Sequence, residues 1–139
     1  MKKHLFALAF GLTAVMGSSL LVASDNLAET GTVPFDFQVG NTRMPAGDYS
    51  ASLTSTHGAI HLRNQATLST IIVSAGANMG GNRSEAKLVF HKYGERYILA
   101  EVWFAEEQFG HKLPTAKLEK ELQASLNGAA PQQIYLAMR

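Results

Sequence analysis

Hydrophobic and polar residues alternate along much of the chain after residue 32, and this period of two predicts β-strands with one buried face. The first alternation runs from Val33 to Val39 and carries two phenylalanines on its apolar side. Further strands are predicted from alternation or from a high content of Thr, Ile and Val: 48–54, a short strand with Ile60 and Leu62, 65–74, and Gln133–Met138. The chain therefore reads as rich in β-structure.

The clearest hairpin joins Ala86–Lys92 to Arg96–Phe104 across Tyr93-Gly94-Glu95, because both arms are apolar and the turn contains glycine. With a loop of two residues, strict alternation predicts one face carrying Leu88, Phe90, Tyr97, Leu99 and Trp103, and another carrying Val89, Ile98, Ala100 and Val102. Two apolar faces are typical of a central strand pair in a sandwich or barrel.

A single helix is predicted over 115–126, where Leu118, Leu122 and Leu126 recur at helical spacing between charged residues. Thr115 is the expected N-cap. Glycine and asparagine over Ala75–Ser84 predict a mobile loop, and 24–32 reads as a loose leader. The expected fold is mostly β, a small antiparallel β-sandwich or barrel-like domain with one C-terminal amphipathic helix, and 24–139 forms a single domain.

The N-terminal residues 1–23 read as a cleavable signal peptide, because Lys2 and Lys3 precede a mostly apolar run from Leu5 to Val22. The alternative is an uncleaved membrane anchor, which the small and polar residues in the second half of the run disfavour. Export to the periplasm or the medium is expected, with the membrane involved only during export. The chain has no cysteine, which excludes a lipid-modified cysteine, disulfides and thiolate metal sites.

Charge and motifs narrow the chemistry further. Without Lys2 and Lys3 the chain has 10 basic and 11 acidic residues, which argues against a nucleic-acid partner. No nucleophile elbow or phosphate loop is present, so neither a catalytic residue nor a cofactor is predicted. Four histidines lack the spacing of metal ligands, so no metal site is predicted: His57, His61, His91 and His111. Glu106-Glu107 is predicted to form a solvated turn. Glu101 is expected either at a strand end that faces water or as a partly buried carboxylate with a perturbed pKa.

Three aromatic residues of the hairpin are the candidate ligand-binding residues: Tyr93, Tyr97 and Trp103. Rings on a sheet face stack on carbohydrates or on hydrophobic ligands. The alternative for Tyr97 and Trp103 is core packing, while Tyr93 in the turn is expected to be exposed.

Two segments carry a resemblance to a family of proteins: Pro34-Phe35-Asp36-Phe37-Gln38-Val39-Gly40-Asn41, and Met44-Pro45-Ala46-Gly47-Asp48-Tyr49. Together they resemble the pattern PFxFxVGNxxLPAGxY of an uncharacterised family of small exported bacterial proteins, frequent in acidobacteria. Later residues are also similar: 88–94, Tyr97-Ile98-Leu99, Trp103, and the stretch from Gly110 to Leu113-Pro114 before the charged helix. Met44 replaces the usual leucine, and the helix is less basic than in the family. The resemblance implies export and a β domain, and it assigns no functional residue.

The leading functional hypothesis is an exported, non-enzymatic β domain that binds an unknown ligand or protein partner at the cell envelope. The second is a structural or assembly subunit that pairs through an exposed edge such as the 33–39 strand or through its helix. The third is a hydrolase without a recognisable motif, whose pocket would gather histidine with Glu101 or Asp36.

Overall fold

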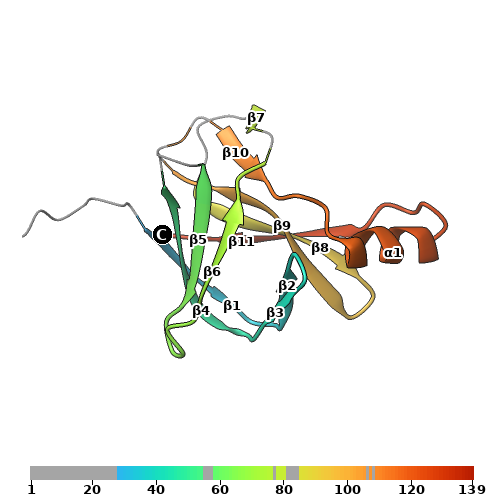
Figure 1. The fold of residues 1–139 in the computed structure, drawn as a ribbon, viewed down its shortest axis with the longest axis horizontal. Coiled ribbons are helices and arrows are strands. Elements are labelled where there is room, and N and C mark those ends of the chain that lie inside the picture. Colours follow the sequence, from blue (N-terminus) through green and yellow to red (C-terminus); the bar gives the residue numbers. More distant parts are fainter. Residues whose placement is uncertain (1–27, 55–57, 77, 81–84, 106, 108) are drawn as a thin grey trace, which may run out of the picture.

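The computed structural model describes residues 28–54, 58–76, 78–80, 85–105, 107 and 109–139. Two β-sheets and one C-terminal helix make up this part of the chain, as predicted for a small β-sandwich-like domain (Figure 1). The signal peptide predicted over 1–23, His57 and Glu106 all lie outside the described residues. No helix in the described ranges combines the length and the hydropathy that crossing a membrane requires.

The smaller sheet has four strands in the order β1-β4-β5-β6, and every neighbouring pair is antiparallel. Its strands are β1 (Glu29–Val33), β4 (Gly47–Thr54), β5 (Ala59–Asn64) and β6 (Thr70–Ser74). The outer edge of β1 is joined to the end of the chain, because the backbone groups of Thr30 and Arg139 form two mutual hydrogen bonds. β6 ends the sheet on the other side.

The larger sheet follows the order β11-β8-β9-β10-β7. These strands are β11 (Gln132–Ala137), β8 (Lys87–Tyr93), β9 (Arg96–Trp103), β10 (Phe109–Lys112) and β7 (Asn78–Gly80). A short hairpin of β2 (Phe37–Val39) and β3 (Thr42–Met44) joins the same sheet, where Gln38 of β2 pairs in parallel with Ile98 of β9. The helix α1 spans Lys117–Ser125.

The core lies between the sheets and is centred on three aromatic rings. Phe37 meets Tyr49 and Phe90 edge to face, with both centroid separations at 5.2 Å. All three side chains are at most 2 % exposed, and they come from β2, β4 and β8. Because these strands belong to both sheets, burial of the rings holds the two layers together.

A β-bulge in the hairpin of β8 and β9 corrects the predicted faces. Val89 pairs with Glu101 but Phe90 pairs with Leu99, so Ala100 is an extra residue in β9. The alternation therefore shifts by one position, which turns Val102 inward and Trp103 outward. The prediction that Trp103 shares a face with Tyr97 is wrong for this reason.

The other differences from the sequence expectations are local. The chain breaks its predicted first strand at residues 34–36, and β1 occupies 29–33, the second half of the predicted leader. The 33–39 segment is not one continuous edge strand: Val33 ends β1, an outer strand of the smaller sheet, and residues 37–39 form β2, which lies between β3 and β9. The predicted loop 75–84 contains β7. The helix begins after Ala116, which is its N-cap without a side-chain hydrogen bond, so Thr115 is not the cap.

Candidate functional site

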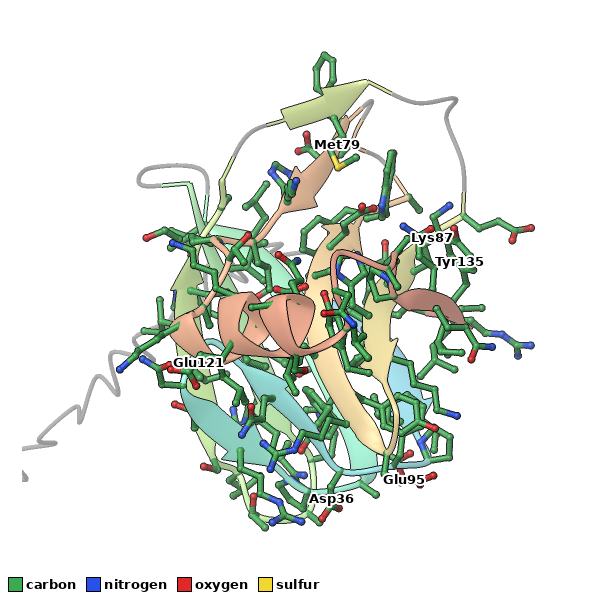
Figure 2. All side chains as sticks on the ribbon, turned by 90° about the vertical axis from the view of Figure 1, so that its right-hand side faces the viewer. Asp36, Met79, Lys87, Glu95, Glu121 and Tyr135 are labelled. Atoms are coloured by element: carbon green, nitrogen blue, oxygen red, sulfur yellow. The ribbon has the colours of Figure 1, made fainter. Side chains whose placement is uncertain are left out.

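The structure places the three predicted aromatic residues in three separate environments. Tyr93 is only 4 % exposed, and side chains of α1, the helix in front of the sheet in Figure 2, contact it. Its hydroxyl donates to Glu119 Oε1 at 2.9 Å and accepts a hydrogen bond from Gln123 at 3.1 Å, both from the helix. The expectation that Tyr93 is exposed is wrong, and its hydroxyl is bonded to the chain's own helix.

Tyr97 lies on the opposite face of the hairpin, where its ring already has stacking partners. The Phe35 ring lies parallel to it, with the centroids 3.7 Å apart and the planes inclined by 13°. Lys92 Nζ lies 5.4 Å from the centroid of the same ring. Tyr97 also packs against the core cluster. Its surroundings therefore match the alternative of core packing rather than ligand stacking.

Trp103 lies on the outer face of β9, and its indole rests on the backbone of β10. A Cβ atom added to Gly110 would be 2.3 Å from Trp103 Cε2, so only glycine leaves room for the ring there. The indole Nε1 donates to Glu101 Oε2 at 2.9 Å, which fixes the in-plane orientation of the ring. Trp103 therefore has a defined position on a sheet face and remains partly exposed.

Two residues that carry no functional signal in the sequence complete this site. Lys87 is the cross-strand neighbour of Trp103, and its Nζ lies 5.0 Å from the indole centroid. The same Nζ lies 5.5 Å from the ring centroid of Tyr135 on β11, which is 58 % exposed. Figure 2 shows Lys87 and Tyr135 close together beside the helix. We call Trp103, Lys87, Tyr135 and Glu101 the aromatic face.

Met79 extends the aromatic face onto β7. It pairs with Gly110, which in turn pairs with Trp103, so the three residues lie in one row on the same side of the sheet. The row continues to Lys87 and then to Ala137 across the β9–β8 and β8–β11 pairs. The uncovered part of the outer face thus carries apolar and aromatic side chains around one ammonium group.

A second concave feature lies at the far end of the hairpin. A cleft of about 370 Å³ is lined by residues in and just before β2, in β3, in the β8–β9 turn and at the start of β9: Asp36, Phe37, Gln38, Arg43, Glu95, Arg96 and Tyr97. Asp36 accepts hydrogen bonds from Arg43 Nη2 and from the backbone of Ala46, each at 2.9 Å, and the latter is the stronger of the causes that lower its pKa. Two carboxylates and two guanidinium groups line the cleft, so it has no net charge.

A buried polar cluster fastens α1 to the sheet. Glu119 is 5 % exposed and accepts hydrogen bonds from His91 Nδ1 at 2.6 Å and from Tyr93. Burial alone would raise the pKa of Glu119, but the hydrogen bonds and the positive charges of His91 and Lys112 together lower it. Burial also raises the pKa of the Tyr93 hydroxyl. The cluster thus holds a carboxylate of α1 against strand β8, and the helix has no other fully buried residue.

The remaining sequence candidates lie apart from one another. His61 is on β5, His91 contacts α1, and His111 is buried on β10. Within the described ranges, no three His, Asp or Glu residues are grouped as metal ligands. Glu101 is held by Trp103 and Asp36 by Arg43, so neither carboxylate is paired with a histidine.

Comparison with known proteins identifies no relative of this chain. A scan against protein-family models, a search of curated proteins and a search of solved structures all give no match.

Proposed function

We propose that this protein is an exported, non-enzymatic domain that binds carbohydrate of the cell envelope through the aromatic face. The observation that carries the proposal is the position of Lys87, whose ammonium lies against the rings of both Trp103 and Tyr135. The three side chains come from three adjacent strands, and Figure 2 shows Lys87 and Tyr135 to one side of α1.

The chemistry of this surface suits a sugar better than a purely apolar ligand. Ring faces stack on the C–H groups of a sugar, while Lys87 donates and Glu101 accepts hydrogen bonds within the same surface. An exposed contact between an ammonium and a ring stabilises by only about 0.5–1 kcal/mol, so Lys87 can leave the rings when a ligand arrives. The indole, in contrast, is fixed by Gly110 and Glu101 and needs no reordering.

The placement at the envelope rests on the N-terminus. The basic start and the apolar run to Val22 are the pattern of a secretory signal, and polysaccharides are abundant ligands outside the cytoplasm. The absence of a catalytic spacing in the sequence, and the pairing of Glu101 and Asp36 with non-histidine partners, favour binding over hydrolysis.

The single tryptophan makes the proposal directly measurable, because Trp103 is the fluorophore and also part of the site. The protein is titrated with a panel of neutral and acidic oligosaccharides while its fluorescence is recorded. Binding is expected to change the emission, and Tyr135→Ala is expected to weaken the affinity about tenfold through loss of one stacking ring. Phe109→Ala is the matched control, since Phe109 is 43 % exposed but points to the other side of β10 from Gly110.

The two variants distinguish binding at the aromatic face from binding elsewhere or no binding. Binding that Tyr135→Ala weakens and Phe109→Ala preserves supports the aromatic face as the site. An unchanged emission with every oligosaccharide of the panel, or equal effects of the two variants, overturns it.

A further inference from the structure

The strand β6 leaves one edge of the smaller sheet without a partner strand among the described residues. Its sequence, Thr70 to Ser74, contains no charged residue and no proline, and three of its five residues are β-branched aliphatics. Natural edge strands usually carry charges, prolines or bulges that prevent pairing with another chain. β6 has none of these, so its edge is suited to receive a further strand.

The side chains of β6 are complementary to a second copy of the same strand. Ile71 and Val73 face the core, while Thr70, Ile72 and Ser74 face outward, and Ile72 is 61 % exposed. In an antiparallel pair centred on Ile72, Ile72 meets its own copy, and Thr70 lies opposite the partner's Ser74. The aliphatic Val73 then lies opposite the partner's Ile71. The contacts are reciprocal, as a two-fold interface requires, and at all five positions they join residues of similar type.

A cavity beside the end of β6 favours the same arrangement. It has a volume of about 150 Å³ and is lined mainly by apolar residues of three segments: Val39, Gly40, Val73, Ser74, Leu113 and Pro114. In the pairing centred on Ile72, the partner's Ile71 lies next to Val73 and on its inward side. Its side chain is therefore on the same side of the sheet as Val73, which lines this cavity.

We propose that two copies of this chain associate through β6 in an antiparallel pair with Ile72 on the two-fold axis, which joins the two smaller sheets into one. The interface is independent of the aromatic face, which lies on the larger sheet. Because β6 has only five residues, the contact is small, and the dimer belongs to the weak, concentration-dependent class.

Cysteine cross-linking tests the proposal, because the chain has no cysteine of its own. Ile72→Cys places two thiols directly opposite each other, within the range of about 4.4–6.8 Å between Cα atoms that a disulfide spans. Mild oxidation of the purified protein is expected to give a covalent dimer. His61→Cys is the matched control, because His61 pairs with Ile72 on the adjacent strand and its two copies would be three strand spacings, about 14 Å, apart.

The register has its own test on the same edge. Thr70→Cys alone is expected to cross-link poorly, since its own copy lies four residues along the strand, and so is Ser74→Cys alone. A mixture of the two variants is expected to cross-link efficiently, because Thr70 lies opposite the partner's Ser74. Cross-linking of each variant with itself at the level of the mixture would overturn the antiparallel register centred on Ile72.

Light scattering at increasing protein concentration supplies a measurement without cysteine. Ile72→Lys sets two ammonium groups against each other and is expected to give a monomer at concentrations where Ile72→Val still associates. Circular dichroism checks that both variants fold, as expected for a side chain that is mostly exposed. A monomeric parent protein at every concentration, or equal cross-linking of Ile72→Cys and His61→Cys, overturns the proposal.

Discussion

His91 Nδ1 lies 2.6 Å from Oε1 of Glu119, and this contact joins the central strand β8 to the helix α1. Glu119 is the one residue of α1 that is fully buried, while Leu118 and Leu122 are only partly covered and Leu126 is 40 % exposed. The helix therefore depends for its docking on an ionised carboxylate more than on an apolar stripe. Its attachment should respond to pH.

Acid is expected to weaken the fold through Glu119. Its pKa in the folded protein is below the ordinary 4.5, so the unfolded chain binds the proton first as pH falls. The stabilisation is complete above pH 4.5 and is lost as pH falls through the lower folded-state pKa. Thermal unfolding between pH 7 and pH 3 measures this loss.

Glu119→Gln serves as the reference for that experiment. The variant is expected to lose about 1–3 kcal/mol at pH 7, because a charged hydrogen-bond acceptor of His91 and Tyr93 is removed from a buried site. Below pH 4.5 its stability should fall less steeply than that of the parent, because the variant has no carboxylate at position 119 to protonate. Identical pH profiles of the two proteins would contradict the assignment.

Tyr49 closes its own turn, and Tyr49→Phe should show how much this contributes. The Tyr49 hydroxyl donates to the carbonyl oxygen of Pro45 at 2.5 Å, and the side chain is fully buried. Burial, the largest influence, raises the pKa of this hydroxyl, so it keeps its proton. We expect the variant to lose about 1 kcal/mol, or roughly 4 °C in Tm for a domain of this size. A Tm unchanged within error would show that the turn is held by other contacts.

Gly110→Ala is expected to displace the indole of Trp103. The added methyl group would overlap three ring atoms at 2.3–2.5 Å, so the ring or the strand must move. The cost expected for such overpacking is about 1–3 kcal/mol, with a change in the tryptophan emission. Gly80→Ala is the control, because nothing lies within 4 Å of a Cβ atom there. Equal emission spectra of the two variants would mean that Trp103 does not rest on Gly110.

The hairpin and the final strand could be predicted from the sequence because their signals are local. The two-residue turn Gly94-Glu95 and the apolar arms around it fix the pairing of β8 with β9, and Ile134 and Leu136 set the face of β11. The bulge at Ala100 could not be predicted, because an alanine within an apolar strand carries no sequence signal that marks it as the extra residue. β1 was missed for a similar reason. Its sequence has little alternation, and its pairing with β4 and Arg139 defines it.

The candidate site also contains residues with a local sequence signal and residues whose role depends on tertiary contacts. Trp103 was identified as a candidate because an aromatic residue in a strand is visible in the sequence. Lys87 and Tyr135 were not, since their contact requires the register of β11 on β8, two strands separated by the whole β9–α1 segment. The burial of Tyr93 also depends on where α1 docks. Chemistry that arises from tertiary contacts between distant segments has no local signal in a single sequence.

His111 is the residue whose replacement should stabilise the protein. It is 6 % exposed, its ring packs edge-on against Phe104, and neither ring nitrogen has a hydrogen-bond partner among the described residues. A buried polar group without a partner costs about 1–3 kcal/mol, so His111→Leu is expected to gain roughly 1 kcal/mol after the loss of some packing volume. Chemical unfolding at pH 7 measures the difference. His111→Gln, which keeps unpaired polar atoms in the same place, should bring no gain, and a less stable His111→Leu would mean that the imidazole has a partner in the folded protein.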